Sequence, residues 1–177
     1  YSKYDINEFI ICCGYKGYMI KEYFANYFLH NCDVTFNMSS GDLLTEIHSS
    51  DCEPWKVTLV DTGYSTQTGG RLLRVKEYLN EGNFCFTYGD GVSNIDIKRL
   101  IQCHISSSKK ATLTAVQPIG RYGTLVLNNN EVVNFTEKPI GDNRWVNGGF
   151  FVLNKSVLNL IEGDNTSWAV SYTHLRA

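Results

Sequence analysis

Short apolar runs that end in glycine alternate with amphipathic helical stretches along most of this sequence. FIICCGYKG (residues 9–17) leads into YMIKEYFANYFL, in which apolar residues recur at helical spacing. VTLVDTG leads into TGGRLLRVKEYL, and NFCFTYGDG precedes another such stretch at 97–105. Strands that alternate with helices favour parallel pairing through crossover connections. The pattern predicts an α/β fold with a mostly parallel mixed sheet.

The strands that follow Pro118 are more closely spaced than those before it. GTLVL, EVVNFTEKP and VNGGFFVL succeed one another with only turns between them, which predicts an added mixed or antiparallel part of the sheet. Ser93 with Asp96 three residues later resembles a capping box for the helix at 97–105. The polar stretch 37–54 does not indicate any particular element.

Composition excludes several classes of protein. The 177 residues are 43% hydrophobic and 13% aromatic, with a net charge of −2, which indicates a globular chain with one sizeable core. A binder of nucleic acid or of a membrane surface would need a basic face, so we expect neither partner. No apolar run is long enough to span a membrane and no signal peptide is evident, so we expect a cytoplasmic protein.

The six cysteines do not have the spacing of a disulfide framework or a zinc site. Cys12 and Cys13 are adjacent, Cys85 lies inside an apolar run, and no Cys-x-x-Cys pair occurs. We therefore expect reduced and mostly buried thiols, as is usual in the cytosol.

The stretch FTYGDGV places a single carboxylate, Asp90, between Gly89 and Gly91 at the end of an apolar run. Ligands of open α/β sheets bind outside the carboxyl ends of the strands. Mg²⁺ prefers one or two carboxylates together with phosphate oxygens, so Asp90 is a candidate magnesium ligand beneath a nucleotide. A plain turn explains the three residues equally well.

Three further motifs are candidate sites of the same kind. In TGGRLLRV, Gly69 and Gly70 would leave backbone N–H groups for an anion at a helix start, and Arg71 adds a forked donor. A glycine-rich loop with a solvated arginine is an equally good reading.

The other two motifs contain sugar-binding residue types. In FTEKP, Glu137 could accept hydroxyl hydrogens and Lys138 could neutralise a phosphate, although an edge-strand charge pair is more common. In VNGGFFVL, Asn147 suits paired hydroxyls, and Gly148 would let a flat ring approach. A plain turn remains open for this last motif.

The order of these motifs resembles the sugar-phosphate nucleotidyltransferase family. The resemblance rests on CGYKGYMIKEYF, VTLVDTG, TGGRL, FTYGDGV, FTEKP and NGGFFVL, and runs from about residue 5 to 168. IICCGYKGY with EPWKVTLVDTG favours the cytidylyl branch. The resemblance implies a Rossmann-like nucleotidyltransferase core of the GT-A type. It also implies that CTP and glucose 1-phosphate yield CDP-glucose and pyrophosphate with Mg²⁺, for the deoxysugars of bacterial surface polysaccharides.

The resemblance also implies roles for single residues. Asp90 would be a magnesium ligand and a catalytic residue, and Gly89 would line the nucleotide site. Thr66, Gly70 and Arg71 match nucleotide contacts. Lys138 would be catalytic through the transferring phosphate. The sugar contacts would be Glu137, Asn147 and Gly148.

The family pattern extends beyond both ends of this chain. Its Gly-Thr-Arg phosphate loop precedes the first residue, and a second metal-binding aspartate follows the matching part. We therefore expect a partial domain at 1–168, a non-native tail at 169–177, and no turnover from these 177 residues alone. The complete protein would be a homo-oligomer. Two alternatives stay open: a nucleotidyltransferase for another nucleotide sugar, or a non-catalytic regulatory subunit that binds a nucleotide sugar.

Overall fold

The chain forms two compact units in the computed structural model. The first unit comprises Tyr1–Asn80 with Leu158–Ala177, and the second comprises Glu81–Val157. The residues that the structure describes are 1–39, 44–48, 52–117, 124–137 and 145–168. The expected tail at 169–177 therefore lies outside the described residues.

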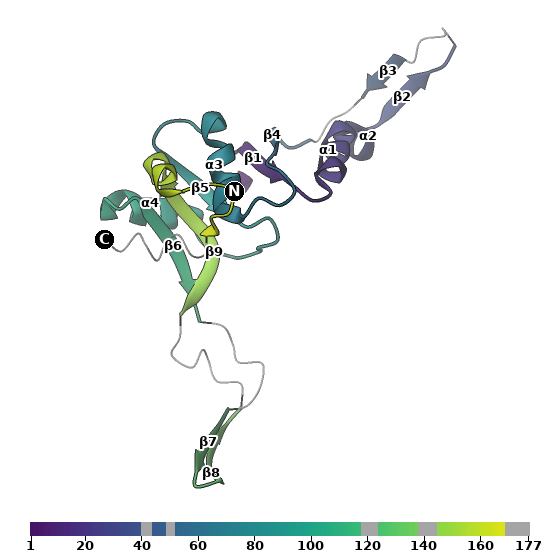
Figure 1. Ribbon diagram of the computed structural model, residues 1–177. Helices are drawn as coiled ribbons and strands as arrows, with labels where there is room; N and C mark the ends of the chain where they lie inside the picture. The colour runs from purple at the N-terminus through teal and green to yellow at the C-terminus, as the bar shows by residue number, and fades with distance from the viewer. Residues whose placement is uncertain (40–43, 49–51, 118–123, 138–144, 169–177) are drawn as a thin grey trace. The chain divides into compact units, whose positions relative to one another are not determined.

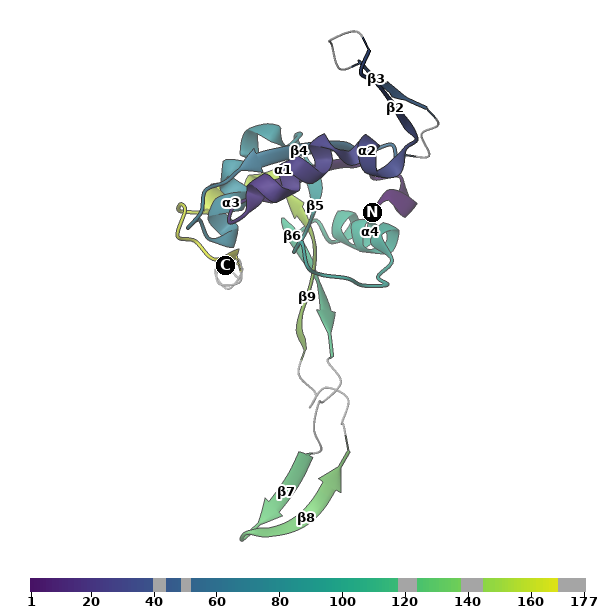
Figure 2. The ribbon, with the colours of Figure 1, turned by 90° about the vertical axis from the view of Figure 1, so that its right-hand side faces the viewer.

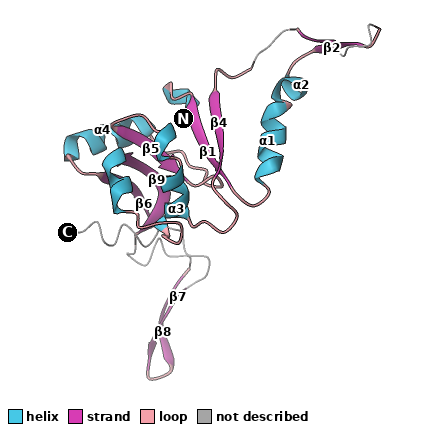
Figure 3. Ribbon diagram, turned by 45° about the horizontal axis from the view of Figure 1, so that its top comes forward, coloured by secondary structure: helices cyan, strands magenta, loops and turns pink. Residues whose placement is uncertain are grey.

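A pair of parallel strands organises the first unit. β1 (Glu8–Cys13) pairs with β4 (Lys56–Asp61) in a register that sets Glu8 opposite Lys56 and Cys13 opposite Asp61. Figure 3 shows the two strands side by side. Because the pairing is parallel and unshifted, both carboxyl ends lie at the same edge, which is where open α/β sheets bind ligands.

Helices and a hairpin connect these two strands. A short 3-10 turn, η1 (Ser2–Tyr4), precedes β1, and α1 (Gly17–Ala25) and α2 (Tyr27–Asn31) then follow one another with a break at Asn26 (Figure 2). β2 (Val34–Asn37) and β3 (Leu44–Ile47) form an antiparallel hairpin. β3 lies within the polar stretch 37–54, which did not indicate any particular element, whereas β2 precedes that stretch except for Asn37.

The rest of the first unit follows β4. It contains α3 (Thr68–Arg74), where the sequence predicted a helix, and the 3-10 turn η2 (Lys76–Tyr78). The α-helix thus ends before the predicted helical stretch TGGRLLRVKEYL does. The side chains of the first unit with the least exposure are Cys13, Thr62, Leu72, Val75, Leu158 and Trp168.

A three-stranded antiparallel sheet forms the centre of the second unit. β9 (Val146–Asn154) lies between β5 (Asn83–Thr87) and β6 (Ala111–Val116), as Figure 1 shows. α4 (Ile97–Ser107) packs against β6 and β9. Residues 150–153 of β9 are almost fully buried, so this strand is the core of the unit.

Two other elements complete the described part of the second unit. β7 (Thr124–Asn128) and β8 (Glu131–Thr136) form an antiparallel hairpin whose turn residues have positive φ angles. The 3-10 helix η4 (Lys155–Leu160) follows β9 and leads back into the first unit.

Two sequence predictions about the fold are wrong. Within the described residues, β1 with β4 is the only parallel pair. β5 and β6 run in the same direction, as their helical crossover requires, but β9 lies between them and is antiparallel to both. The expected capping box is also absent, because Asp96 itself caps α4 by accepting a 3.0 Å hydrogen bond from the Arg99 N–H.

In the part of the chain that the structure describes, every helix is too short or too polar to cross a membrane.

Candidate functional site

Thr62 connects the carboxyl ends of β1 and β4 through two hydrogen bonds. Thr62 follows β4 and is fully buried. Its N–H and its hydroxyl both donate to the Cys13 carbonyl, each over 2.8 Å. The parallel register is thereby extended by one residue, and the loops that leave the two strands start from a fixed position.

Arg71 binds the same strand ends through its guanidinium group. Nη1 donates to Oγ1 of Thr62 over 2.7 Å and to the Cys13 carbonyl over 3.2 Å, and Nη2 donates to the Tyr64 carbonyl over 3.3 Å. A Cβ at Gly14 would lie 2.3 Å from Nη1, so the glycine makes room for this contact. The solvated arginine of the alternative reading is therefore wrong, since Arg71 fixes the strand-end loops.

The glycines at the start of α3 serve a packing role. The N–H groups of Gly69 and Gly70 donate to the Thr166 carbonyl over 2.9 and 3.2 Å. A Cβ at Gly70 would lie 2.5 Å from Cα of Asp164. The expectation that these N–H groups remain available to an anion is wrong, because the segment 163–168 already occupies the helix start.

An ion pair reinforces this docked segment. Arg74 donates from Nε to Oδ1 of Asp164 over 2.9 Å and from Nη1 to the Thr62 carbonyl over 3.2 Å. The Arg74 hydrogen bond lowers the pKa of Asp164, while the same bond raises the pKa of Arg74. Arg74 therefore links the docked segment to the end of β4.

Thr66 lies in the loop between β4 and α3 and is only 8% exposed. The loop turns at Gly63, whose φ of +86° lies in the region that favours glycine. A Cβ at Gly63 would approach Oγ1 of Thr66 to 2.8 Å. Thr66 is thus held by the fold of the loop, with its hydroxyl on the inner side of the turn.

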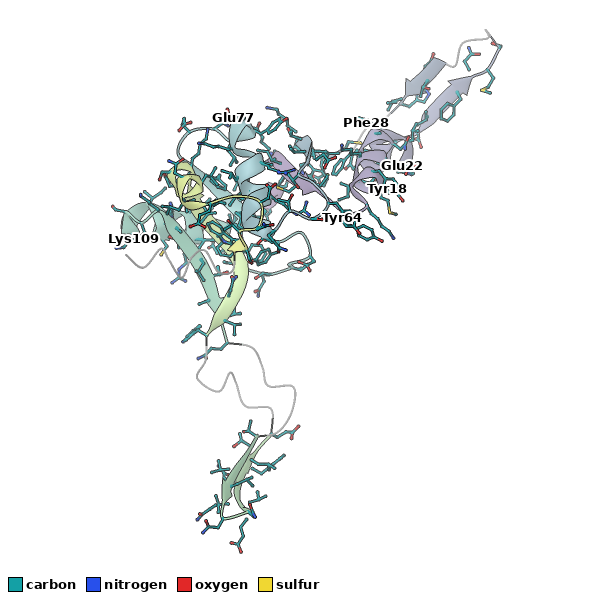
Figure 4. The ribbon with its side chains drawn as sticks, in the orientation of Figure 1. Tyr18, Glu22, Phe28, Tyr64, Glu77 and Lys109 are labelled. Carbon is teal, nitrogen blue, oxygen red and sulfur yellow. The ribbon has the colours of Figure 1, made fainter. Side chains whose placement is uncertain are left out.

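Two exposed tyrosines at this edge were not singled out from the sequence. Tyr15 follows β1 and Tyr64 follows β4; they are 66% and 74% exposed, and their rings meet edge to face with centroids 5.6 Å apart. Lys16 Nζ lies 5.4 Å from the Tyr15 ring centre. Figure 4 shows Tyr64 among the side chains. Such rings can stack on a base or a sugar, and their signal was an aromatic residue beside glycine at each strand end.

Asp90 lies in an exposed turn at the end of β5 in the second unit. The Gly91 N–H donates to the Tyr88 carbonyl over 3.2 Å, which closes the turn. Both Gly89 and Asp90 are exposed, and a Cβ at Gly89 would meet no atom within 4 Å. Internal packing therefore does not require Gly89, and the Asp90 carboxylate has no hydrogen bond or ion pair to the described residues.

Asn147 lies beside this turn because β9 is antiparallel to β5. Its Nδ2 is 3.4 Å from the Tyr88 hydroxyl, and its Oδ1 accepts a 2.8 Å hydrogen bond from the Gly149 N–H. The structure thus brings together two sequence candidates, Asn147 and the Gly89–Asp90 turn, which are more than fifty residues apart in the chain. One acceptor position of the amide is already used within the strand.

Gly148 lies in an irregular part of the β6–β9 pairing, between Leu113 opposite Phe151 and Ala115 opposite Asn147. A Cβ at Gly148 would lie 2.7 Å from Oγ1 of Thr114. That hydroxyl also donates to the Phe150 carbonyl over 3.1 Å. The expectation that Gly148 makes room for a flat ring is wrong on this side, since Thr114 fills the space.

Of the two charged residues in the Glu-Lys-Pro motif, the structure describes only the glutamate. Glu137 follows β8 directly and is exposed. Lys138 lies outside the described residues, and so do the residues that follow it up to 144.

Asp90 is the carboxylate that the sequence indicated as a candidate magnesium ligand. Among the described residues there is no group of three or more His, Cys, Asp and Glu side chains that could enclose a metal ion. One exposed, unpaired carboxylate nonetheless fits Mg²⁺, which keeps several waters and takes further ligands from substrate phosphates. Zinc, which takes four protein ligands in structural sites, does not fit these residues.

Comparison with known proteins gives a consistent result. Residues 3–172 match the family model described as nucleotidyl transferase. The chain is 58% identical over 169 residues to glucose-1-phosphate cytidylyltransferase of Salmonella typhimurium, and 37% identical over 167 residues to a probable glucose-1-phosphate cytidylyltransferase of Bacillus subtilis. These matches cover 95% and 94% of this chain. The chain spans 65% and 64% of the length of those two relatives.

Solved structures support the fold. HddC from Yersinia pseudotuberculosis superposes with a TM-score of 0.59 at 18% identity, covering 93% of this chain and 64% of that one. A UDP-glucose pyrophosphorylase complexed with UDP-glucose superposes with a TM-score of 0.53 at 11% identity, covering 96% of this chain and 69% of that one. At these identities the likeness establishes the mixed α/β fold alone.

Proposed function

Because this chain belongs to the nucleotidyl transferase family, we propose that the complete protein forms CDP-glucose and pyrophosphate from CTP and glucose 1-phosphate. The observation that carries the proposal is the 58% identity to a glucose-1-phosphate cytidylyltransferase across 95% of the chain. Relatives described as guanylyltransferases of a heptose phosphate match at only 26% identity, which favours the cytidylyl reaction over that alternative.

Asp90 is the residue that we assign to Mg²⁺. Its carboxylate is exposed and unpaired among the described residues, and Gly89 leaves open space beside it. When bound there, Mg²⁺ would neutralise phosphate charge and orient the triphosphate. Asp90 contributes a fixed negative charge at a strand end, and the turn closed by the Gly91 N–H holds that charge in place.

The reaction needs no protein base. A sugar phosphate, whose second pKa is about 6, is already a dianion at neutral pH. Its oxygen forms a bond to the α-phosphorus of CTP, the bond from that phosphorus to the bridging oxygen breaks, and pyrophosphate leaves. The protein supplies alignment and charge neutralisation, which are the main sources of catalysis in phosphoryl transfer.

The remaining candidates are assigned by unit. In the second unit, Asn147 and Glu137 would bind sugar hydroxyls, Gly148 would shape the same strand, and Lys138 would neutralise the transferring phosphate. In the first unit, Thr66 and Arg71 would border the nucleotide, whereas Gly70 packs against Asp164. Arg71 donates to three atoms of its own chain, so we assign it chiefly to positioning the loops at the strand ends.

Pyrophosphate release by the complete protein tests the proposal. We expect CTP with glucose 1-phosphate to give the highest kcat/KM among CTP, UTP, dTTP and GTP. Asp90→Asn should lower kcat by at least about 100-fold, as loss of a group that acts electrostatically in the transition state does. Glu77→Gln is the matched control, since Glu77 is also an exposed carboxylate (labelled in Figure 4) and should leave kcat unchanged.

Two outcomes would contradict this assignment. A higher kcat/KM with UTP, dTTP or GTP would show that the protein is a nucleotidyltransferase for another nucleotide sugar. Absence of turnover together with CDP-glucose binding that survives Asp90→Asn would favour the non-catalytic regulatory subunit. Calorimetric titration with CDP-glucose distinguishes this second outcome from a misfolded protein.

A further inference from the structure

Two cysteines that are twenty residues apart in the chain meet in the first unit. The sulfur atoms of Cys32 and Cys52 lie 3.1 Å apart. Cys32 is the C-cap residue of α2, where its N–H donates to the Phe28 carbonyl over 2.9 Å. Cys52 lies four residues before β4 begins. The spacing of these two residues matches no metal or disulfide motif, so no sequence pattern pairs them.

The β2–β3 hairpin determines this meeting. Val34 pairs with Ile47 at the open end of the ladder. Beyond that rung, the His48 N–H donates to the Asp33 carbonyl over 2.8 Å, and the His48 ring bonds to Thr35 Oγ1 over 2.8 Å. Cys32 directly precedes Asp33, so its contact with Cys52 lies at the open end of the hairpin. Figure 1 shows this hairpin, formed by β2 and β3, after α2.

We propose that Cys32 and Cys52 form a reversible disulfide that closes the base of the β2–β3 hairpin, as a redox modification site of the protein. A disulfide has a sulfur–sulfur distance of about 2.05 Å, so the two atoms need to approach by only about 1 Å. The two sulfur atoms are therefore already close enough for one thiol to react with the other once it is oxidised.

A peroxide is the oxidant that this proposal names. One thiolate attacks a peroxide oxygen, the O–O bond breaks, and a sulfenic acid forms with release of water. The second thiolate attacks the sulfenic sulfur and displaces the hydroxyl group, which leaves as a second water. Two thiols and one hydrogen peroxide thus give one disulfide and two waters, and exchange with a dithiol reverses the bond.

The other four cysteines have different surroundings. Burial raises the pKa of Cys12 to about 11 and also raises the pKa values of Cys13 and Cys85, which keeps these thiols protonated at neutral pH. Cys103 is exposed on α4 and lies in the other unit. It therefore serves as an internal reference for an exposed thiol that contacts no other sulfur among the described residues.

Peptide mapping tests the proposal directly. The folded chain is treated with hydrogen peroxide, alkylated and digested with trypsin, which yields residues 22–56 as one peptide that contains both cysteines and no internal lysine or arginine. We expect this peptide to lose two hydrogens and to carry no alkyl group. A second digestion after Glu46 should release two fragments only when a reductant is present.

Matched variants distinguish the Cys32–Cys52 disulfide from oxidation of other residues. Oxidation should raise the Tm of the unaltered chain and of Cys103→Ser, and dithiothreitol should reverse the rise, because the bond restricts the unfolded chain. Cys52→Ser should show no rise. The proposal is overturned if both thiols remain alkylated when Cys103 is already oxidised, or if the product is a disulfide between two molecules on a non-reducing gel. None of these measurements depends on catalytic activity, so they test the proposal independently of the proposed function.

Discussion

Arg71 donates a 2.7 Å hydrogen bond to Oγ1 of Thr62, and the Thr62 hydroxyl in turn donates a 2.8 Å hydrogen bond to the Cys13 carbonyl. The charged group thereby joins α3 to the ends of β1 and β4. A bond from a charged donor contributes about 1.5–3 kcal/mol, more than a neutral one. The side chain at position 71 is therefore a structural element of the carboxyl edge, whatever ligand that edge receives.

Gly14→Ala should displace this guanidinium. The new Cβ would lie 2.3 Å from Nη1, and Arg71 would have to leave Thr62 and Cys13. We expect the free energy of unfolding to fall by about 2 kcal/mol, the contribution of the charged hydrogen bonds. Urea unfolding of Gly14→Ala measures the loss.

Gly89→Ala is the matched control for that substitution. A Cβ at Gly89 meets no atom within 4 Å, so stability should stay within about 1 kcal/mol of the starting value. In an Arg71→Ala background the Gly14→Ala penalty should disappear, because the two residues share one contact. Equal losses in both backgrounds would show that Arg71 is not the cause.

Gly70→Ala should loosen the docked segment 163–168. Its Cβ would meet backbone atoms of Asp164 at 2.5 and 2.6 Å, and backbone cannot rotate away as a side chain can. We expect a loss of about 3 kcal/mol, the upper end of overpacking effects. Hydrogen exchange should accelerate at the Gln67 and Gly69 amides, which donate to this segment. Unchanged exchange at those amides would contradict the assignment.

His104 should make stability depend on pH. It is 2% exposed, its Nδ1 lies 2.9 Å from Thr112 Oγ1, and burial lowers its pKa below the ordinary value of 6.5. The folded state binds this proton less readily than the unfolded state. Stability is therefore complete above pH 6.5 and is lost as the pH falls from 6.5 toward the folded pKa.

Thermal unfolding between pH 7.5 and 5 measures this dependence. His104→Asn should reduce the slope, because asparagine does not titrate and can place a polar atom near Thr112. His30→Asn, at an exposed position, is the control and should keep the slope. A slope that persists in His104→Asn would assign the titration to another group.

Asp96→Ala should destabilise α4 by about 1 kcal/mol, the usual cost of losing an N-cap side chain. The carboxylate accepts the Arg99 N–H over 3.0 Å. Ser93→Ala should have a smaller effect, since its hydroxyl accepts only a 3.3 Å bond from the Ile95 N–H outside the helix. Urea unfolding compares the two variants. A greater loss of unfolding free energy for Ser93→Ala would support the Ser93–Asp96 capping box expected from the sequence.

The local pattern of residues determined much of this protein. Apolar runs at 9–13, 57–60 and 84–86 became strands, and the helical spacing after Gly17 and Ile97 became α1 and α4. The Gly-Asp-Gly stretch became an exposed turn at the end of β5. These predictions succeeded because periodicity and turn chemistry act over a few neighbouring residues, and the printed sequence contains all of those neighbours.

The contacts between distant segments became known only from the three-dimensional arrangement of the chain. β9 lies between β5 and β6. The N–H groups at the start of α3 donate to the Thr166 carbonyl, and Arg71 donates to the Thr62 hydroxyl. The same arrangement brings the sulfurs of Cys32 and Cys52 together. Residue patterns indicate the local conformations. The choice of partners depends on packing between segments tens of residues apart, and no local pattern encodes that choice.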